Sequence, residues 1–285
     1  MDEATVARFL EAILPVVLDA GEFAVQAQVN VQNIGKAADE ESQSTPVEFV
    51  KLREQAKTIV DEQVQEKILL AVYSAFGEKF ARIDGEEDTP SKGFFTQADS
   101  DITLVIDPID GTLQYLKGSK DYSVNIALVS KGEVLCAVQY FPAYGRLYLL
   151  DEEKSAFVCI YEKQNLMRVD RLQPPATVKT ETIYVNHRVP NQECLANTYA
   201  VVKDADGIVL WTDAFFKCTS GEYAAVLLFR PQIRDMLLGS MIAAMPGGYA
   251  VDFAGNPIKW PDGGRIQEVI FGFGELPADI KACFA

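Results

Sequence analysis

Residues 102–118, ITLVIDPIDGTLQYLKG, decide how the rest of the chain is interpreted. The stretch opens with β-branched and leucine side chains, and such a run predicts a buried strand. The run ends in Asp107 and Asp110, which lie on either side of Pro108. Because proline fixes its own φ and biases the preceding residue toward an extended backbone, both carboxylates leave the strand on a stiff turn. Their oxygens could then converge on a hard cation.

Gly111 and Thr112 follow the two acids directly. If a helix begins there, its free backbone N–H groups and its dipole would face the cation and hold a phosphate. An acidic Asp-Gly turn after a strand is also a common hairpin signal or a solvated turn. The spacing alone leaves both interpretations open.

The stretch also resembles the signature of the inositol monophosphatase superfamily, whose members are metal-dependent, lithium-sensitive phosphatases. The resemblance implies a fold of the α+β / α/β class, a layered αβαβα sandwich of the sugar-phosphatase type with two subdomains. We expect an N-terminal α+β subdomain over residues 1–150, with most metal ligands. A C-terminal α/β subdomain over residues 151–285 would carry Asp235 and the substrate-facing residues.

Further metal ligands follow from the resemblance. Gly-Glu-Glu at 85–87 stands where the family places a glutamate that joins metal and water, which makes Glu86 that glutamate and Glu87 its support. Clustered acids of this kind are otherwise ordinary exposed turns. Arg234 precedes Asp235 where the family has a tryptophan. The implied ligands are oxygen donors, which suit two or three Mg²⁺ ions rather than zinc: Glu86, Asp107, the carbonyl of Ile109, Asp110 and Asp235.

The resemblance assigns the attacking water to Glu86 and Thr112, with an aspartate behind them. The segment Thr58-Ile59-Val60-Asp61 matches a Thr-x-x-Asp of the family and makes Asp61 that aspartate. An alignment on residues 66–69 would put Glu62 there instead.

Substrate contacts are expected from two places. Backbone amides of Gly111 and Thr112 would hold the phosphate. Residues 216–223 are predicted to open an apolar helix through 224–229, so that Lys217, Ser220 and Glu222 face a polyol or ribose; a simple helix cap is the alternative. This alignment lacks a strand that the family has before Asp235. The single histidine, His187, fits a surface loop better than a site.

These residues predict a Mg²⁺-dependent phosphomonoesterase that hydrolyses a small phosphorylated polyol, such as inositol monophosphate, with a metal-activated water. Residues 113–142 resemble the 3′(2′),5′-bisphosphate nucleotidase branch, so an adenosine bisphosphate is an alternative substrate. A non-catalytic regulatory or binding relative is the alternative from another class. The resemblance also implies a homodimer.

The composition limits the partners. The chain has 285 residues, 48% of them hydrophobic, and a formal net charge of −15, which argues against nucleic-acid polymers and anionic membranes. The N-terminus is acidic and no apolar run is long enough to span a bilayer, so we expect a cytoplasmic protein. The cysteines are odd in number at 5 and widely spaced, which predicts reduced, mostly buried thiols.

Periodicity predicts the remaining elements. Helices are expected over 6–28, with a kink at Pro15, and over 47–76, with a loop at 29–46. Strands are expected over 122–129, 133–140, 146–150, 182–185 and 200–202, with loops at 151–154 and 168–179.

Overall fold

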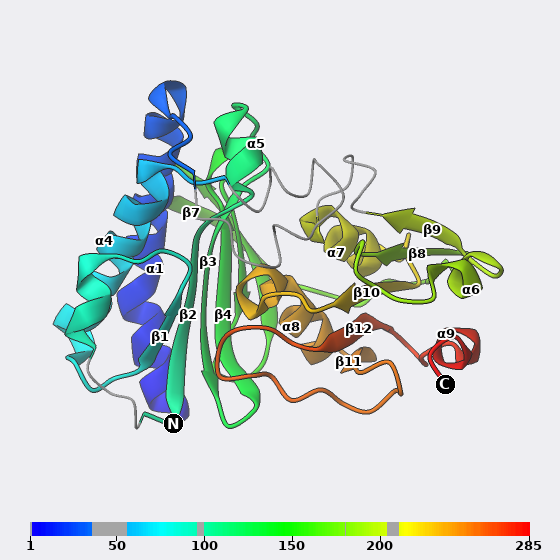
Figure 1. The fold of residues 1–285 in the computed structure, drawn as a ribbon. Helices are drawn as coiled ribbons and strands as arrows, with labels where there is room; N and C mark the ends of the chain where they lie inside the picture. The colour runs from blue at the N-terminus through cyan, green and yellow to red at the C-terminus, as the bar shows by residue number, and fades with distance from the viewer. Residues whose placement is uncertain (1, 36–55, 96–99, 180, 204–210) are drawn as a thin grey trace.

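The computed structural model describes residues 2–35, 56–95, 100–179, 181–203 and 211–285. These residues form alternating layers of helices and sheets (Figure 1). The helices are α1 (Glu3–Ala27), α4 (Ile59–Phe76), α5 (Thr112–Leu116), α6 (Gln192–Ala196), α7 (Trp211–Thr219), α8 (Leu237–Ala244) and α9 (Ala278–Ala282). Short 3₁₀ turns are η1 (Gln28–Asn30), η2 (Pro90–Phe94), η3 (Pro142–Tyr144) and η5 (Ile233–Met236).

Counted over the described residues, the first sheet has seven strands, which lie in chain order. They are β1 (Arg82–Gly85), β2 (Ile102–Asp110), β3 (Ser123–Ser130), β4 (Glu133–Phe141), β5 (Arg146–Leu150), β6 (Ala156–Glu162) and β7 (Asn165–Arg171). Only β1 and β2 pair in parallel, and the other neighbours are antiparallel. Strands β6 and β7 extend this sheet beyond residue 150, through a segment where the sequence predicted a loop from residue 168.

Both faces of the first sheet are buried. Leu104 and Ile106 of β2 pack with α1 and α4, whereas Val105 packs on the opposite face with α7 and α8. Side chains alternate between the faces of a strand, so a continuous apolar run is what burial on both faces requires. The predicted buried strand is therefore confirmed.

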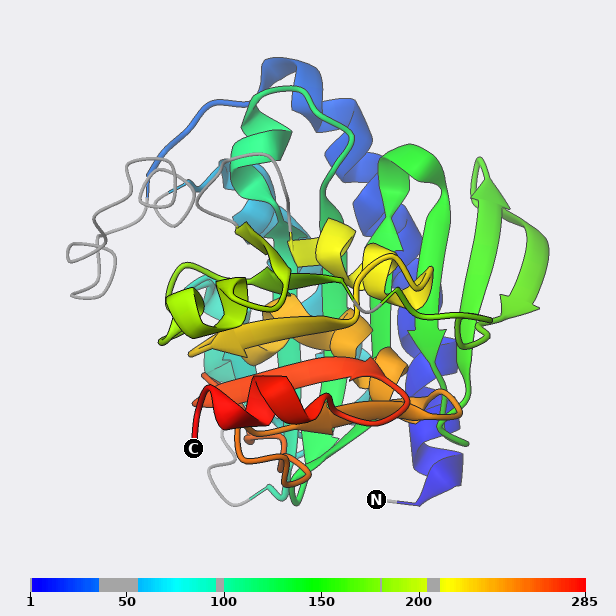
Figure 2. The same cartoon turned by 90° about the vertical axis from the view of Figure 1, so that its right-hand side faces the viewer.

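The second sheet packs against the other side of α7 and α8 (Figure 1). Its strand order is β11 (Gly248–Val251), β12 (Glu268–Phe273), β10 (Ala225–Phe229), β8 (Thr182–Val185) and β9 (Ala200–Lys203). Strands β8, β9 and β10 are parallel. Figure 2 shows α6 and α9 on the face turned away from the first sheet, where Leu195 and Ile280 are buried. This arrangement confirms the predicted αβαβα layering.

The helix predicted through 224–229 is wrong. Ala225–Phe229 is strand β10, with Val226 and Leu228 packed on one face and Leu227 on the other. A short apolar run is compatible with either a buried strand or a buried helix, and here pairing to β8 and β12 selects the strand. The strand that the sequence alignment found missing before Asp235 is thus present as β10.

The predicted N-terminal helix runs through Pro15 as part of α1. The second predicted helix begins at Ile59, and residues 47–55 of that prediction lie outside the described residues, as do residues 36–46 of the predicted loop. Within the described residues, no helix has the length and apolarity that a membrane span needs.

The cysteine prediction is correct for three residues and wrong for two. Cys136, Cys159 and Cys218 are buried free thiols. Cys194, which lies in α6, forms a disulfide with Cys283, which follows α9, across 89 residues of sequence. The pair is brought together by the packing of these two helices on the same face of the second sheet, so the disulfide could not be predicted from the spacing of the cysteines.

Candidate functional site

Two parallel strands of the first sheet end side by side and deliver the first acidic side chains. The backbone N–H of Glu86, directly after β1, donates to the carbonyl of Ile106 at 3.1 Å. Asp107 is the next residue of β2 and is buried. Pairing of β1 with β2 therefore sets Glu86 beside Asp107, although about twenty residues separate them in the sequence.

The turn after Asp107 depends on glycine. The pairing of β2 with β3 shifts register between Asp107 and Asp110, and Gly111 then adopts a φ of 90°. A Cβ on Gly111 would lie 2.9 Å from the backbone oxygen of Asp121. Only glycine fits both the conformation and this close approach. The turn ends the strand and starts α5 at Thr112.

Asp235 follows strand β10 of the second sheet and is tied to this turn by one buried amide. Asp235 lies in η5, next to Arg234. The Nδ2 group of Asn125 donates to Oδ2 of Asp110 at 3.3 Å and to the carbonyl of Arg234 at 3.1 Å. Asn125 is in turn held by Ser123 at 2.9 Å. Asn125 thus fixes the η5 backbone, and with it Asp235, against the acidic turn formed by residues 107–111. No sequence motif points to Asn125.

The four predicted carboxylates face one another closely enough to perturb one of them. Burial, followed by the charges of Glu86, Asp110 and Asp235, raises the pKa of Asp107 well above its usual range. Such a group of repelling acids favours a bound cation.

The chemistry of this cluster fits a hard divalent cation. Its side chains are oxygen donors, and the buried Oδ1 of Asp107 has no hydrogen-bond partner among the described residues. The cluster is not closed around an ion, since no three carboxylate, imidazole or thiol side chains within the described ranges are arranged to hold a metal. The guanidinium of Arg234 faces the same acids, with Nη2 3.9 Å from Oε1 of Glu86.

Asp61, rather than Glu62, lies against the acidic turn. Oδ2 of Asp61 accepts from the backbone N–H of Thr58 at 2.9 Å and from its hydroxyl, which completes a capping box at the start of α4. Its Oδ1 lies 3.1 Å from the hydroxyl oxygen of Thr112. Asp61 is fully buried, so the helix cap fixes its orientation toward Thr112.

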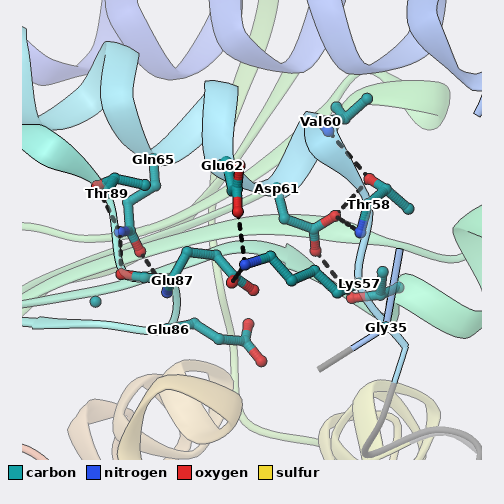
Figure 3. A network of polar contacts seen from close by, with 12 residues as sticks. Gly35, Lys57, Thr58, Val60, Asp61, Glu62, Gln65, Glu86, Glu87 and Thr89 are labelled. Atoms are coloured by element: carbon teal, nitrogen blue, oxygen red, sulfur yellow. Dashed lines mark hydrogen bonds and ion pairs between the residues drawn. The ribbon is translucent and has the colours of Figure 1, made fainter. Parts of the chain in front are cut away.

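Glu62 points to a different partner. Nζ of Lys57 lies 2.7 Å from Glu62 and 2.8 Å from Glu87. Figure 3 shows Glu62 and Glu87 joined to Lys57, and Glu86 outside these contacts. The amide of Gln65 holds the backbone of Glu87 from both sides, at 2.9 Å and 2.6 Å. Glu87 is therefore a buried structural neighbour of Glu86.

The structure does not bring Ser220 and Glu222 to the carboxylates. Both are exposed and precede β10, whereas Asp235 follows the opposite end of that strand. A strand of this length spans roughly 16 Å. Ser220 hydrogen-bonds to Glu222 at 3.2 Å, and Lys217 contacts the Tyr223 hydroxyl at 3.4 Å. The predicted role in substrate binding rested on a helix start that is in fact the end of α7.

The opposite end of α7 is the one that approaches the acidic turn, because the chain reverses from α7 into β10. Asp213, in the first turn of α7, lines the same pocket as Asp121. Partial burial, followed by the charge of Asp121, raises the pKa of Asp213. A pocket of about 460 Å³ opens between them. Its lining is aromatic and acidic with one arginine: Asp121, Phe141, Tyr144, Arg146, Tyr148, Thr212, Asp213 and Phe216. No sequence motif points to this pocket.

His187 and Arg188 follow β8. Because β8 and β10 are parallel, these two residues share the sheet edge from which Asp235 comes, and both are half-buried. The buried Asn186 pins this edge by exchanging hydrogen bonds of 3.0 Å with the backbone of Phe229. Arg188 is thus better placed than Lys217 to reach a ligand at the acidic turn.

Two proteins of known name are similar to part of this chain. A putative Nus factor SuhB of Neisseria meningitidis is 25% identical over 187 residues, which are 63% of this chain and 67% of that relative. The 3′(2′),5′-bisphosphate nucleotidase CysQ of Escherichia coli is 27% identical over 177 residues, 61% of this chain and 68% of the relative. The aligned segments therefore leave about a third of each relative unmatched.

A solved structure of an IMPase/NADP phosphatase, complexed with Mg²⁺ and phosphate, has the same fold. It superposes with a TM-score of 0.71 at 14% identity and covers 98% of this chain and 95% of its own. The model of the inositol monophosphatase family matches residues 19–269, which include the acidic turn and Asp235. The chain belongs to the inositol monophosphatase family.

Proposed function

We propose that this chain is a Mg²⁺-dependent phosphomonoesterase that hydrolyses a small phosphorylated polyol, with inositol monophosphate as the type. The observation that carries the proposal is the placement of four carboxylates around one turn: pairing of β1 with β2 sets Glu86 beside Asp107, and the Asn125 amide ties Asp110 to the backbone next to Asp235. Binding without catalysis would not require the Asp61–Thr112 contact beside these acids. The magnesium and phosphate in the related IMPase/NADP phosphatase support the same chemistry.

Each predicted metal ligand would contribute to magnesium binding. Glu86, Asp107 and Asp110 would hold magnesium together with the Ile109 carbonyl, and Asp235 would complete a further position. When bound, magnesium supplies Lewis acidity that makes a water more acidic and offsets charge on the phosphate and on the leaving alkoxide. Lithium is expected to inhibit hydrolysis by occupying one of these positions.

The chain's own residues would orient the attacking water and accept its proton. The Thr112 hydroxyl has one proton, which it can donate to Asp61 at 3.1 Å or to the Ile109 carbonyl at 2.9 Å. Its lone pairs then accept a hydrogen bond from the water, while Glu86 serves as the general base. The backbone amides of Gly111 and Thr112 would hold the phosphate. Water would add to phosphorus as its proton passes to Glu86, the ester P–O bond would break, and the leaving alkoxide would take a proton from solvent water.

A matched pair of variants tests the water-holding role. Asp61→Asn is expected to lower kcat by about a hundredfold, because it removes the charge that receives the Thr112 hydrogen bond. Glu62→Gln, one residue away, should stay within about threefold of wild type, since it weakens only a half-exposed ion pair to Lys57. Steady-state kinetics of both variants check this. Equal losses in the two variants, or a larger loss in Glu62→Gln, would assign the role to Glu62.

The pocket beside the acidic turn favours a polyol over a bisphosphate. The backbone of Asp121 approaches Gly111, and the Tyr144 hydroxyl donates to Oδ1 of Asp121 at 2.7 Å. With Asp213 opposite, two carboxylates can accept hydrogen bonds from substrate hydroxyls and would repel a second phosphate. The second candidate function, a 3′(2′),5′-bisphosphate nucleotidase, is favoured by Arg146 in the same pocket and by the likeness to CysQ.

A substrate panel assayed with and without magnesium tests both functions. We expect turnover only with magnesium, and a higher kcat/KM for inositol 1-phosphate than for adenosine 3′,5′-bisphosphate. Asp213→Asn should lower the ratio of these two values by roughly fivefold or more, as one pocket charge is lost. Glu222→Gln, at the far end of β10, should leave the ratio unchanged. A wild-type ratio below one favours the nucleotidase, and no turnover of any phosphomonoester favours the non-catalytic relative.

A further inference from the structure

Arg234 brings a positive charge into the acidic cluster that the proposed metals are meant to neutralise. Nη2 lies 3.9 Å from Oε1 of Glu86 and Nη1 lies 3.9 Å from Oδ1 of Asp84. Only 16% of the side chain is exposed. The guanidinium therefore lies inside the cluster and bridges acids on both sides of the end of β1.

The position of this side chain is fixed from its backbone outward. Asn125 binds the carbonyl of Arg234 and also Asp110. Asp84 is held from its other side by the backbone N–H of Gly264 at 2.7 Å. Arg234 thus extends from a backbone anchored to one metal ligand toward a second, Glu86.

Electrostatics hold the guanidinium in its charged form. Its Nη atoms face the carboxylates of Glu86 and Asp84, and opposite charges at this separation favour the ionised form. The buried Nε has no hydrogen-bond partner among the described residues, so the group is held by charge more than by complementary hydrogen bonds. A guanidinium is weakly hydrated and cannot lose its proton, which suits it to a buried acidic site.

This inference rests on the proposed function: we propose that Arg234 is a resident cation of the site. It takes the place of one further Mg²⁺ ion, beyond those assigned above, that Asp84 and Glu86 would otherwise attract. The guanidinium offsets one carboxylate charge and stands where it would repel an additional divalent ion. The chain then binds fewer magnesium ions than the acidic side chains alone would allow. The same charge keeps the metal-free protein stable, because it relieves the repulsion between the acids.

Calorimetric titration of the purified full chain with Mg²⁺ alone tests this inference, together with thermal melting in EDTA. Arg234→Gln should bind one more Mg²⁺ per chain than wild type. Its Tm in EDTA should be lower by roughly 3 °C or more, and its Tm should rise more on addition of magnesium. Arg234→Lys, which keeps the charge, should retain the wild-type number of ions.

Arg230→Gln is the matched control, since Arg230 is an exposed residue of the same connection and the substitution changes net charge equally. It should match wild type in both measurements. Equal Mg²⁺ stoichiometry and equal EDTA Tm in wild type and Arg234→Gln would overturn the inference and leave the phosphatase proposal standing. If neither protein binds Mg²⁺, the metal requirement of the proposed function fails and the inference fails with it.

Discussion

Asp107→Asn is expected to abolish magnesium-dependent hydrolysis while leaving the metal-free protein at least as stable as wild type. The loss in kcat/KM should be on the order of a hundredfold or more, because even groups that only support metal ligands contribute tenfold to a hundredfold. The two effects have opposite signs for one reason. Asp107 is buried among other acids, and that repulsion is useful only when a cation relieves it.

The sign of the stability effect follows from the raised pKa of Asp107. A carboxyl whose folded-state pKa exceeds its unfolded value destabilises the folded protein as pH rises from the unfolded value through the folded one. Asparagine cannot ionise, so the variant should gain Tm relative to wild type in EDTA at neutral pH. The gain should disappear at a pH below the ordinary pKa of aspartate.

Paired measurements of turnover and Tm check this result. Asp101→Asn is a suitable control because Asp101 precedes the same strand but is exposed, and its ion pair within the described part of the chain is with the exposed Lys131 at 3.0 Å. It should change neither quantity appreciably. Near-normal turnover in Asp107→Asn would remove Asp107 from the metal site, whatever its effect on stability.

The acidic turn could be predicted because its information is local. The apolar run, Pro108 and Gly111 specify a buried strand that ends in a tight turn, and the structure has that strand and that turn. Approach of Glu86 to Asp107 follows from parallel pairing of β1 with β2. In the sequence, it is the resemblance to the family that predicts Glu86 and Asp107 in one metal site.

The substrate side could not be predicted because it depends on pairing between distant segments. Whether Ala225–Phe229 is a helix or a strand is decided by β8 and β12, which supply its partners. Once it is a strand, Glu222 and Asp235 lie at opposite ends, and the first turn of α7 replaces its last turn beside the acids. The same long-range packing creates the Cys194–Cys283 disulfide.

The contacts of charged residues that belong to no motif could not be predicted from the sequence either. Lys57 looks like one more polar residue before a helix, yet it bridges Glu62 and Glu87. Burial lowers the pKa of Lys57, while hydrogen bonds to both glutamates outweigh this and raise it. This ion pair includes Glu87 and not its neighbour Glu86. In the sequence, only the resemblance to the family separates the roles of these two glutamates.

That distinction gives the second large expected effect. Glu86→Gln should lower kcat by about a hundredfold or more, because it removes a base and a ligand charge while keeping the side-chain volume. Its Tm in EDTA should change little. Loss of the Glu86 charge removes repulsion with Asp107 and also weakens a contact to Arg234 that is as long as 3.9 Å.

Glu87→Gln should show the reverse pattern. Only 3% of the Glu87 side chain is exposed, and its ion pair with Lys57 is 2.8 Å long, so its loss leaves a lysine partly buried beside a neutral amide. Breaking such a pair typically costs about 3 kcal/mol or more, reduced here because Lys57 keeps Glu62. Activity assays and thermal melting curves of both variants distinguish a loss of turnover from a loss of stability. If Glu86→Gln keeps most of its rate while Glu87→Gln loses it, Glu87 is the base and the Lys57 ion pair sets its charge.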